Sequence, residues 1–161
     1  MKYPVNNLPI ELISSVGFEE GFSSRIYIDT EGFQTIGYGF CLDKIGMPKP
    51  VAKYWLKLIL RNTAKRLTTS EQMGEIFNGL NQHRQTALIN IAYQLGLNGL
   101  GSFKKMWRAL EQENWKKAKQ EALDSVWASQ TPHRAKRIAE VLLTGTMDVY
   151  SESMRQFSET D

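Results

Sequence analysis

The chain has few of the residues from which disulfide frameworks and zinc sites are built. It contains one cysteine, Cys41, and two histidines, His83 and His133, among 161 residues. A single cysteine excludes an internal disulfide framework and suits synthesis in a reducing compartment. The three residues are also too few and too scattered for a zinc site. We therefore expect no metal and no other cofactor.

Long hydrophobic segments are also missing from the sequence. No run approaches the ~18–20 apolar residues that span a bilayer, and residues 1–7 lack the charged-then-apolar pattern of a secretory signal. Membrane insertion is therefore not expected. The hydrophobic content of 42% and the charged content of 23% are ordinary for a folded globular protein. A chain of this length can bury a sizeable core, in one compact unit or two lobes.

The net charge of +3 is small, but the basic residues are unevenly distributed. Residues 101–140 hold nine lysines and arginines against five acidic residues. Such a segment attracts polyanions. Solvated helix faces explain the same cluster at least as well. No recognised nucleic-acid-binding motif accompanies the charge, so nucleic acid is not the expected partner.

A carboxylate at the end of a predicted helix is the first candidate catalytic group. Residues 9–20 are typical of a short helix, which Gly21 ends. The helical phase places Glu20, rather than Glu19, within an apolar stripe that contains Ile10, Ile13 and Val16. A carboxyl drawn toward such a stripe loses hydration and retains its proton near neutral pH, which suits a general acid.

A predicted hairpin follows the helix and carries a second carboxylate. Residues 26–29 alternate like a strand, residues 29–32 form a turn, and residues 33–38 return as the second strand. This pairing brings Thr35 close to Asp29. Taken singly, each group has an ordinary role as a surface charge, a turn former or a strand former. Together, two carboxylates in unlike environments and a hydroxyl predict hydrolysis of a glycosidic bond.

This region resembles the active-site region of the phage-type lysozymes (glycoside hydrolase family 24), most closely their T-even branch. The resemblance rests on Glu-Gly at 20–21, Asp-Thr-Glu-Gly at 29–32 and Thr-Ile-Gly-x-Gly at 35–39. Further matches extend it over about residues 12–150. They comprise Arg84, residues 87–90, Gln94, Gly96, Trp127, residues 130–137 and residues 144–146.

The expected fold is α+β and mostly helical, with two lobes and a cleft between them. After the hairpin the pattern is helical throughout, so we expect a single catalytic domain over residues 1–161. Its small lobe covers about residues 12–47, a connecting helix about 48–66, and a helical lobe about 67–156. Within the helical lobe, capping residues and apolar periodicity predict helices near 69–79, 81–95, 102–112, 114–124, 131–143 and 147–156.

The resemblance implies a muramidase that cuts the β-1,4 bond from N-acetylmuramic acid to N-acetylglucosamine in peptidoglycan. By the same resemblance Glu20 is the general acid, Asp29 the second carboxylate, and Thr35 helps to seat the attacking water. Arg134 is implied to pair with Glu20 and orient it, and the reaction to invert the anomeric carbon. We expect a monomeric endolysin that accumulates in the host cytoplasm and depends on a separate membrane-permeabilising protein.

Other residues are candidates for binding the sugar chain. Tyr93 and Gln94 occupy cleft-lining positions of the family, although a core tyrosine is an equally good explanation of the first. Glu31 and Gly39 are weaker candidates. Cys41 is included with them, but as a small buried hydrophobe it needs no such role.

The sequence departs from the family pattern beside the hairpin. Phe40 stands where the family has a histidine, and the segment at residues 41–46 is short. Packing is therefore expected to replace an ion pair, and one side of the sugar groove is expected to be more open. Two alternative functions stay open: a lytic transglycosylase, and a non-catalytic wall-binding protein on a lysozyme scaffold.

Overall fold

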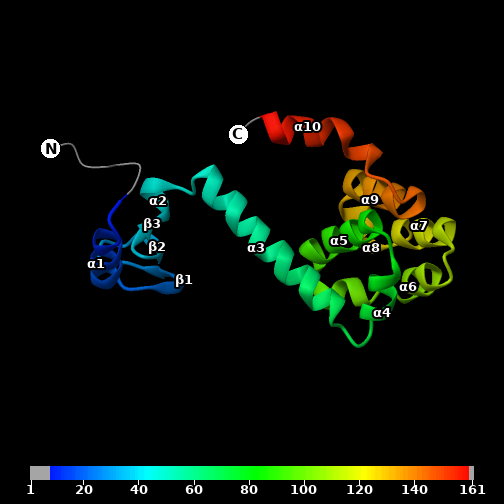
Figure 1. Cartoon of the computed structure of the whole chain (residues 1–161), viewed down its shortest axis with the longest axis horizontal. Coiled ribbons are helices and arrows are strands. Elements are labelled where there is room, and N and C mark those ends of the chain that lie inside the picture. The colour runs from blue at the N-terminus through cyan, green and yellow to red at the C-terminus, as the bar shows by residue number, and fades with distance from the viewer. Residues whose placement is uncertain (1–7, 160–161) are drawn as a thin grey trace. The chain divides into compact units, whose positions relative to one another are not determined.

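The computed structural model describes residues 8–159, and the chain divides into two compact units, Met1–Tyr54 and Trp55–Asp161. We call them unit 1 and unit 2 and describe each by itself (Figure 1). The segment at residues 1–7, on which the expectation about a secretory signal depends, lies outside the described residues. Between residues 8 and 159, no helix is both long and apolar enough to cross a membrane.

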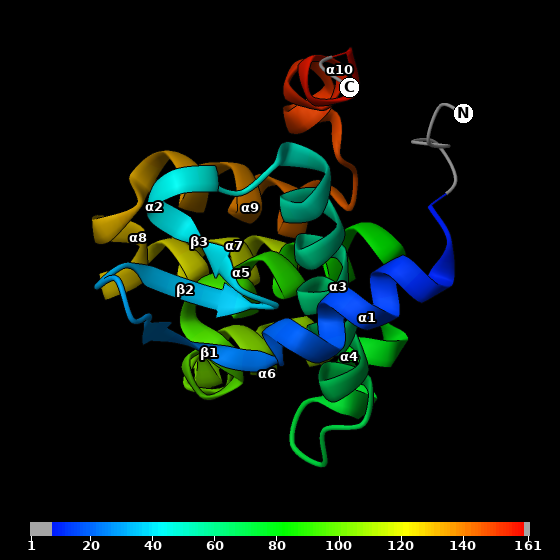
Figure 2. The same ribbon diagram turned by 90° about the vertical axis from the view of Figure 1, so that its left-hand side faces the viewer.

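Unit 1 consists of a helix, a small antiparallel sheet and a second short helix. The sheet has the strand order β1-β2-β3, and its register pairs Tyr27 with Thr35 and Thr35 with Cys41. Thr35 therefore lies on the middle strand of the sheet. Figure 2 shows the three strands. The elements are α1 (Ile10–Glu20), β1 (Ser23–Ile28), β2 (Gln34–Gly37), β3 (Phe40–Cys41), α2 (Leu42–Ile45) and the start of α3 (Lys49–Thr68).

Two elements of unit 1 were not expected from the sequence. The segment predicted as a short bridge after the hairpin contains the third strand, β3, and the helix α2. Gly37 and Gly39 have φ values of +71° and +70°, and such positive values suit a reversal of the chain. This reversal allows Phe40 to pair with Ile36. Two-residue strands give almost no periodic signal, so the pattern alone could not reveal β3.

The helix α1 forms where it was predicted, but the environment predicted for its side chains is wrong. None of its eleven residues is buried, and Ile10, Ile13 and Val16 are all at least half exposed. Glu20 is exposed as well. Loss of hydration against an apolar stripe is therefore not a property of Glu20 in this structure.

Aromatic packing surrounds the position where the family has a histidine. The ring of Tyr38 lies 5.2 Å from that of Phe22 and 6.5 Å from that of Phe40, measured between ring centroids. The Phe40 ring also covers Gly37, where a Cβ atom would come within 2.8 Å of it. Phe40 therefore makes ring contacts here while remaining 50% exposed, and the replacement of an ion pair by packing stays a prediction.

Unit 2 is a helical bundle. Its buried core includes Leu88 and Ile91 on α5, Leu110 on α6 and Ile138 on α9. The helix α9 packs against α5, α7 and α8, as Figure 1 shows. Besides the rest of α3, the elements are α4 (Gly74–Gly79), α5 (Gln82–Gly101), α6 (Lys104–Glu111), α7 (Trp115–Leu123), α8 (Val126–Gln130), α9 (Pro132–Thr144), the 3-10 turn η1 (Asp148–Tyr150) and α10 (Ser151–Glu159).

Capping residues predicted some helix boundaries of unit 2 correctly. The side chains of Asn81 and Asn114 accept hydrogen bonds from the backbone of Arg84 and Lys117, so they cap α5 and α7 as predicted. The predicted end of α5 near residue 95 marks a real break, because Gly96 has the non-helical angles φ 71° and ψ 173°.

Other boundaries differ from the prediction because the capping groups have other partners. Ser70 accepts a bond from the amide of Met73 within a turn, so α4 begins only at Gly74. Ser102 donates to the carbonyl of Gly99 at the end of α5 and does not cap α6. Ser125 caps α8 through the amide of Ala128, and this helix of five residues was not predicted.

Candidate active site

The turn between β1 and β2 is organised around the carboxylate of Asp29. Its Oδ1 atom accepts hydrogen bonds from the backbone amides of Glu31 and Phe33, each at 2.9 Å. The backbone amide of Asp29 donates to the Phe33 carbonyl at 2.9 Å, and the Gly32 amide donates to the Asp29 carbonyl at 3.0 Å. An Asp at the start of such a turn bonds the backbone that follows it. The orientation of the carboxylate is therefore determined by the main chain.

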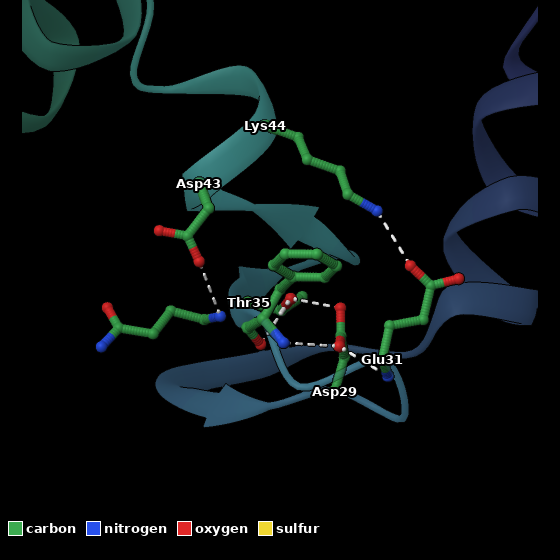
Figure 3. Close-up of polar contacts among 7 residues, drawn as sticks. Asp29, Glu31, Thr35, Asp43 and Lys44 are labelled. Atoms are coloured by element: carbon green, nitrogen blue, oxygen red, sulfur yellow. Dashed lines mark hydrogen bonds and ion pairs between the residues drawn. The ribbon is translucent and has the colours of Figure 1, made fainter.

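The hydroxyl of Thr35 holds the other carboxylate oxygen. Thr35 Oγ1 donates to Asp29 Oδ2 at 3.1 Å, as Figure 3 shows. Thr35 is only 2% exposed, while Asp29 is half-buried. The predicted proximity of Thr35 to Asp29 is thus present, and it follows from the pairing of Thr35 with Tyr27 two positions before Asp29.

These hydrogen bonds stabilise the ionised form of Asp29. The backbone bond from Phe33 is the largest cause that lowers the pKa of Asp29 below its ordinary value of 3.8, with smaller contributions from Thr35, the amide of Glu31 and the charge of Lys44. Burial acts in the opposite direction and is outweighed. Asp29 is therefore a carboxylate at neutral pH and can accept a proton.

Glu20, at the last position of α1, lies against the backbone of Gly39. A Cβ atom at Gly39 would overlap with the carboxylate of Glu20. Gly39 also has a φ of +70°, a value that L side chains rarely adopt. The glycine thus serves Glu20 by leaving room for it. Gly39 was expected as a sugar-binding residue, and its structural environment indicates a contact with Glu20.

The two carboxylates belong to one continuous set of contacts within unit 1. Glu20 lies against Gly39, which precedes β3. Cys41 of that strand is the register partner of Thr35, and the hydroxyl of Thr35 donates a hydrogen bond to Asp29. Cys41 is neither fully buried nor exposed, so the expectation of a buried hydrophobe holds only in part.

Glu31 has an ionic partner that the sequence did not indicate. Lys44 on α2 approaches Glu31 with its Nζ atom 2.9 Å from Oε2, and the same Nζ lies 4.2 Å from the centroid of the Phe33 ring. The neighbouring Asp43 accepts a hydrogen bond from the amide of Gln34 at 3.2 Å. Since α2 itself was not predicted, sequence reasoning had no signal for these contacts.

The remaining candidate residues belong to unit 2. Arg134 donates from Nε to Asn90 Oδ1 at 2.8 Å and from one terminal nitrogen to the Asn90 carbonyl at 3.1 Å. Both residues line a pocket of about 430 Å³ with Tyr93, whose side chain is exposed. Asn90 was part of the matched motif but was not recognised as a partner of Arg134. The pairing of Arg134 with Glu20 that the resemblance implies stays a prediction.

Gln94 makes a hydrogen bond within unit 2. Its Oε1 atom accepts from the indole nitrogen of Trp127 at 2.8 Å, and Trp127 is buried. This bond connects α5 to α8 and orients the amide of Gln94. A role of Gln94 in binding sugars stays a prediction, and its contact with Trp127 is structural.

Comparison with known proteins finds a matching family profile and several individual relatives. The phage lysozyme family profile matches residues 18–142. Two probable T4-type lysozymes of Dictyostelium discoideum are 28% and 29% identical, over 83% of this chain and 94% of each relative. The pre-baseplate central spike protein Gp5 of Enterobacteria phage T4 is 30% identical over 85% of this chain, and the chain spans only 28% of its length.

The chain is mostly helical and of the α+β class. Its hairpin carries an ionised aspartate that a hydroxyl holds, and the preceding helix ends in a glutamate. These are the features of a glycoside hydrolase that uses two carboxylates. The matched profile covers most of the chain and makes the class specific. The chain belongs to the phage lysozyme family, and its enzymatic activity is that of a lysozyme. The modest identities leave the predicted closeness to the T-even branch as a prediction.

Proposed function

We propose that the protein is a muramidase that hydrolyses the β-1,4 bond between N-acetylmuramic acid and N-acetylglucosamine in peptidoglycan. The observation that carries the proposal is the geometry around Asp29, whose two oxygens are held by the main chain and by Thr35. Family membership supports the substrate class.

In the proposed reaction Glu20 donates its proton to the glycosidic oxygen while the bond from that oxygen to the anomeric carbon breaks. A water molecule attacks the anomeric carbon from the opposite face, and its proton passes to Asp29. Oδ1 of Asp29 is occupied by two amides, so Oδ2, which accepts from Thr35, is the oxygen that we assign to the water. The configuration of the carbon is inverted, because water and not the protein is the nucleophile.

Each residue of unit 1 then has a distinct role. Asp29 acts as the base because it is ionised and its carboxylate is held in one orientation, and Thr35 seats the water indirectly by orienting Oδ2. Glu20 acts as the acid, and Gly39 leaves the space that its carboxylate occupies. Tyr93 is proposed to bind substrate, a role supported by its exposure and by the pocket that it lines, and Arg134 of the same pocket is proposed to orient Glu20.

The chain offers a matched pair of variants for the catalytic assignment. Glu19 and Glu20 are adjacent, both exposed and both on α1. We expect Glu20→Gln to abolish the clearing of permeabilised Gram-negative cells, and Glu19→Gln to clear them at close to the normal rate. Binding to purified wall and the thermal midpoint should be retained in both. An unchanged clearing rate in Glu20→Gln would refute the assignment of the acid.

We further propose that the protein lyses the host cell from the cytoplasm at the end of a phage infection. The family's description as phage lysozyme supports a phage origin for this activity. The test is expression in a bacterium with and without a separate membrane-permeabilising protein. Lysis is expected only when both are present, with Glu20→Gln as the inactive control. Equal lysis without the permeabilising protein would contradict the proposed dependence.

A further inference from the structure

We propose that Asp43 and Lys44 of α2 are positioning residues for the reaction, which clamp the turn that holds Asp29 and Thr35. We call this pair the α2 clamp. The inference rests on the proposed function, because it assumes that Asp29 is the catalytic carboxylate. Figure 3 shows both residues reaching from α2 over the turn.

The contacts of Lys44 converge on the two residues that hold Asp29. The side chain of Lys44 bonds Glu31 at 2.9 Å, and its Nζ lies 4.2 Å from the centre of the Phe33 ring. The backbone amides of these same residues donate to Asp29 Oδ1. Lys44 therefore fixes, through two side chains, the two amides that orient the carboxylate.

Asp43 acts on the first residue of β2. Its Oδ2 accepts from the amide of Gln34 at 3.2 Å, and Gln34 directly precedes Thr35. Gln34 is also the residue that pairs with Ile28, directly before Asp29. Two consecutive residues of a four-residue helix thus contact two residues of the turn and the first residue of β2.

The charge of Lys44 also acts on Asp29 through space. The hydrogen bond to Glu31 raises the pKa of Lys44 above its ordinary value, so the amine is charged at neutral pH. That charge is one of the causes that lower the pKa of Asp29. Lys44 interacts electrostatically with Glu31 and Asp29 of the turn and with Cys41 on β3. The other titratable groups on the packed elements are Asp43 on α2, Arg25 and Tyr27 on β1, and Tyr38 between β2 and β3. Removal of the Lys44 charge should therefore raise the pKa of Asp29.

The expected effects are moderate because the ion pair is on the surface. The side chains of Lys44 and Glu31 are 56% and 67% exposed, and exposed pairs are held weakly. We expect Lys44→Met to lower kcat by about 3–10-fold with little change in KM, since the effect is on geometry and not on substrate contact. Lys44→Arg should recover most of the loss. Asp43→Ala should behave like Lys44→Met, and Asp43→Asn, which retains an acceptor oxygen, should recover most of the activity.

The test measures kcat, KM and the pH profile of these four variants on a soluble peptidoglycan fragment. The matched control is Lys57→Met, which removes the charge of an exposed lysine on α3. In Lys44→Met the acid limb of the profile should move to higher pH, and a ¹³C NMR titration should show the same shift for the Asp29 carboxyl. Lys57→Met should shift neither.

The outcomes separate this inference from the proposed function. Normal kcat and an unshifted Asp29 titration in Lys44→Met, beside an inactive Asp29→Asn, would overturn the clamp alone. Full activity in Asp29→Asn would overturn the catalytic role of Asp29 and the clamp together. A loss in Lys44→Met that Lys57→Met reproduces would also overturn the clamp, because the effect would then be one of net charge.

Discussion

Gly39→Ala is the substitution that most directly tests whether the space beside Gly39 serves catalysis. An alanine Cβ would overlap with the carboxylate of Glu20, and the backbone would keep a φ near +70°. The positive φ should cost about 1–3 kcal/mol of the free energy of unfolding. The overlap itself should cost little stability, because the end of a flexible exposed side chain can move away. Its consequence is a displaced proton donor.

The magnitude of the activity loss follows from that displacement. A misplacement of about 1 Å at a reacting group can lower the rate by ~100-fold. Gly46→Ala is the matched control, because Gly46 also has a positive φ, +62°, but open space where its Cβ would lie. We expect similar losses of stability in both variants and a roughly 100-fold lower kcat in Gly39→Ala alone, measured on the folded fraction.

A second comparison distinguishes displacement of Glu20 from obstruction of the substrate. If the alanine acts through Glu20, kcat falls while KM changes little. Equal specific activities of Gly39→Ala and Gly46→Ala would refute the reasoning. A rise in KM alone would restore the original prediction that Gly39 binds the sugar.

Three further predictions concern pH dependence and stability. Because the pKa of Asp29 is lowered in the folded protein, its contribution to the free energy of unfolding is present above about pH 3.8 and is lost as pH falls through the folded value. Urea titrations between pH 2 and 6 should therefore show that Asp29→Asn loses less stability in acid than the wild-type protein does. An equal loss of stability would contradict this prediction. Arg84 donates hydrogen bonds to the carbonyls of Leu142 and Leu143, and its guanidinium lies 3.7 Å from the centre of the Trp115 ring. Arg84→Met should therefore lower the free energy of unfolding in urea by about 2 kcal/mol. A loss below roughly 0.5 kcal/mol would contradict this. Glu113 has a φ of 53°, and Glu113→Gly should stabilise the protein by about 0.5 kcal/mol without altering activity; a lower thermal midpoint would contradict the inferred strain.

The sequence was sufficient for the features that depend on local chemistry. Helix caps at Asn81 and Asn114, the break at Gly96 and the turn around Asp29 all follow from side chains that bond their own neighbourhood. The proximity of Thr35 to Asp29 also followed, since hairpin pairing depends on turn length and alternation. Of these features, the turn around Asp29 and its contact with Thr35 belong to the candidate site.

The features that the sequence did not predict depend on contacts between residues that are far apart along the chain. The α2 clamp requires a short helix of four residues, which has no measurable periodicity. The packing of Glu20 against Gly39 joins residues nineteen apart and required the third strand. The apolar stripe of α1 predicted burial for Glu20, but amphipathic phase gives only the direction of a side chain and does not supply a partner.

The central claim is that Glu20 and Asp29 catalyse hydrolysis by water, and analysis of the products tests it most directly. Peptidoglycan digested by the wild-type protein and by Glu20→Gln should be compared by mass spectrometry, with ¹⁸O-labelled water as solvent. We predict reducing N-acetylmuramic acid ends that carry one ¹⁸O atom, formed by the wild-type protein and not by Glu20→Gln. Unlabelled anhydro-muramyl ends, or equal product from Glu20→Gln, would contradict the account.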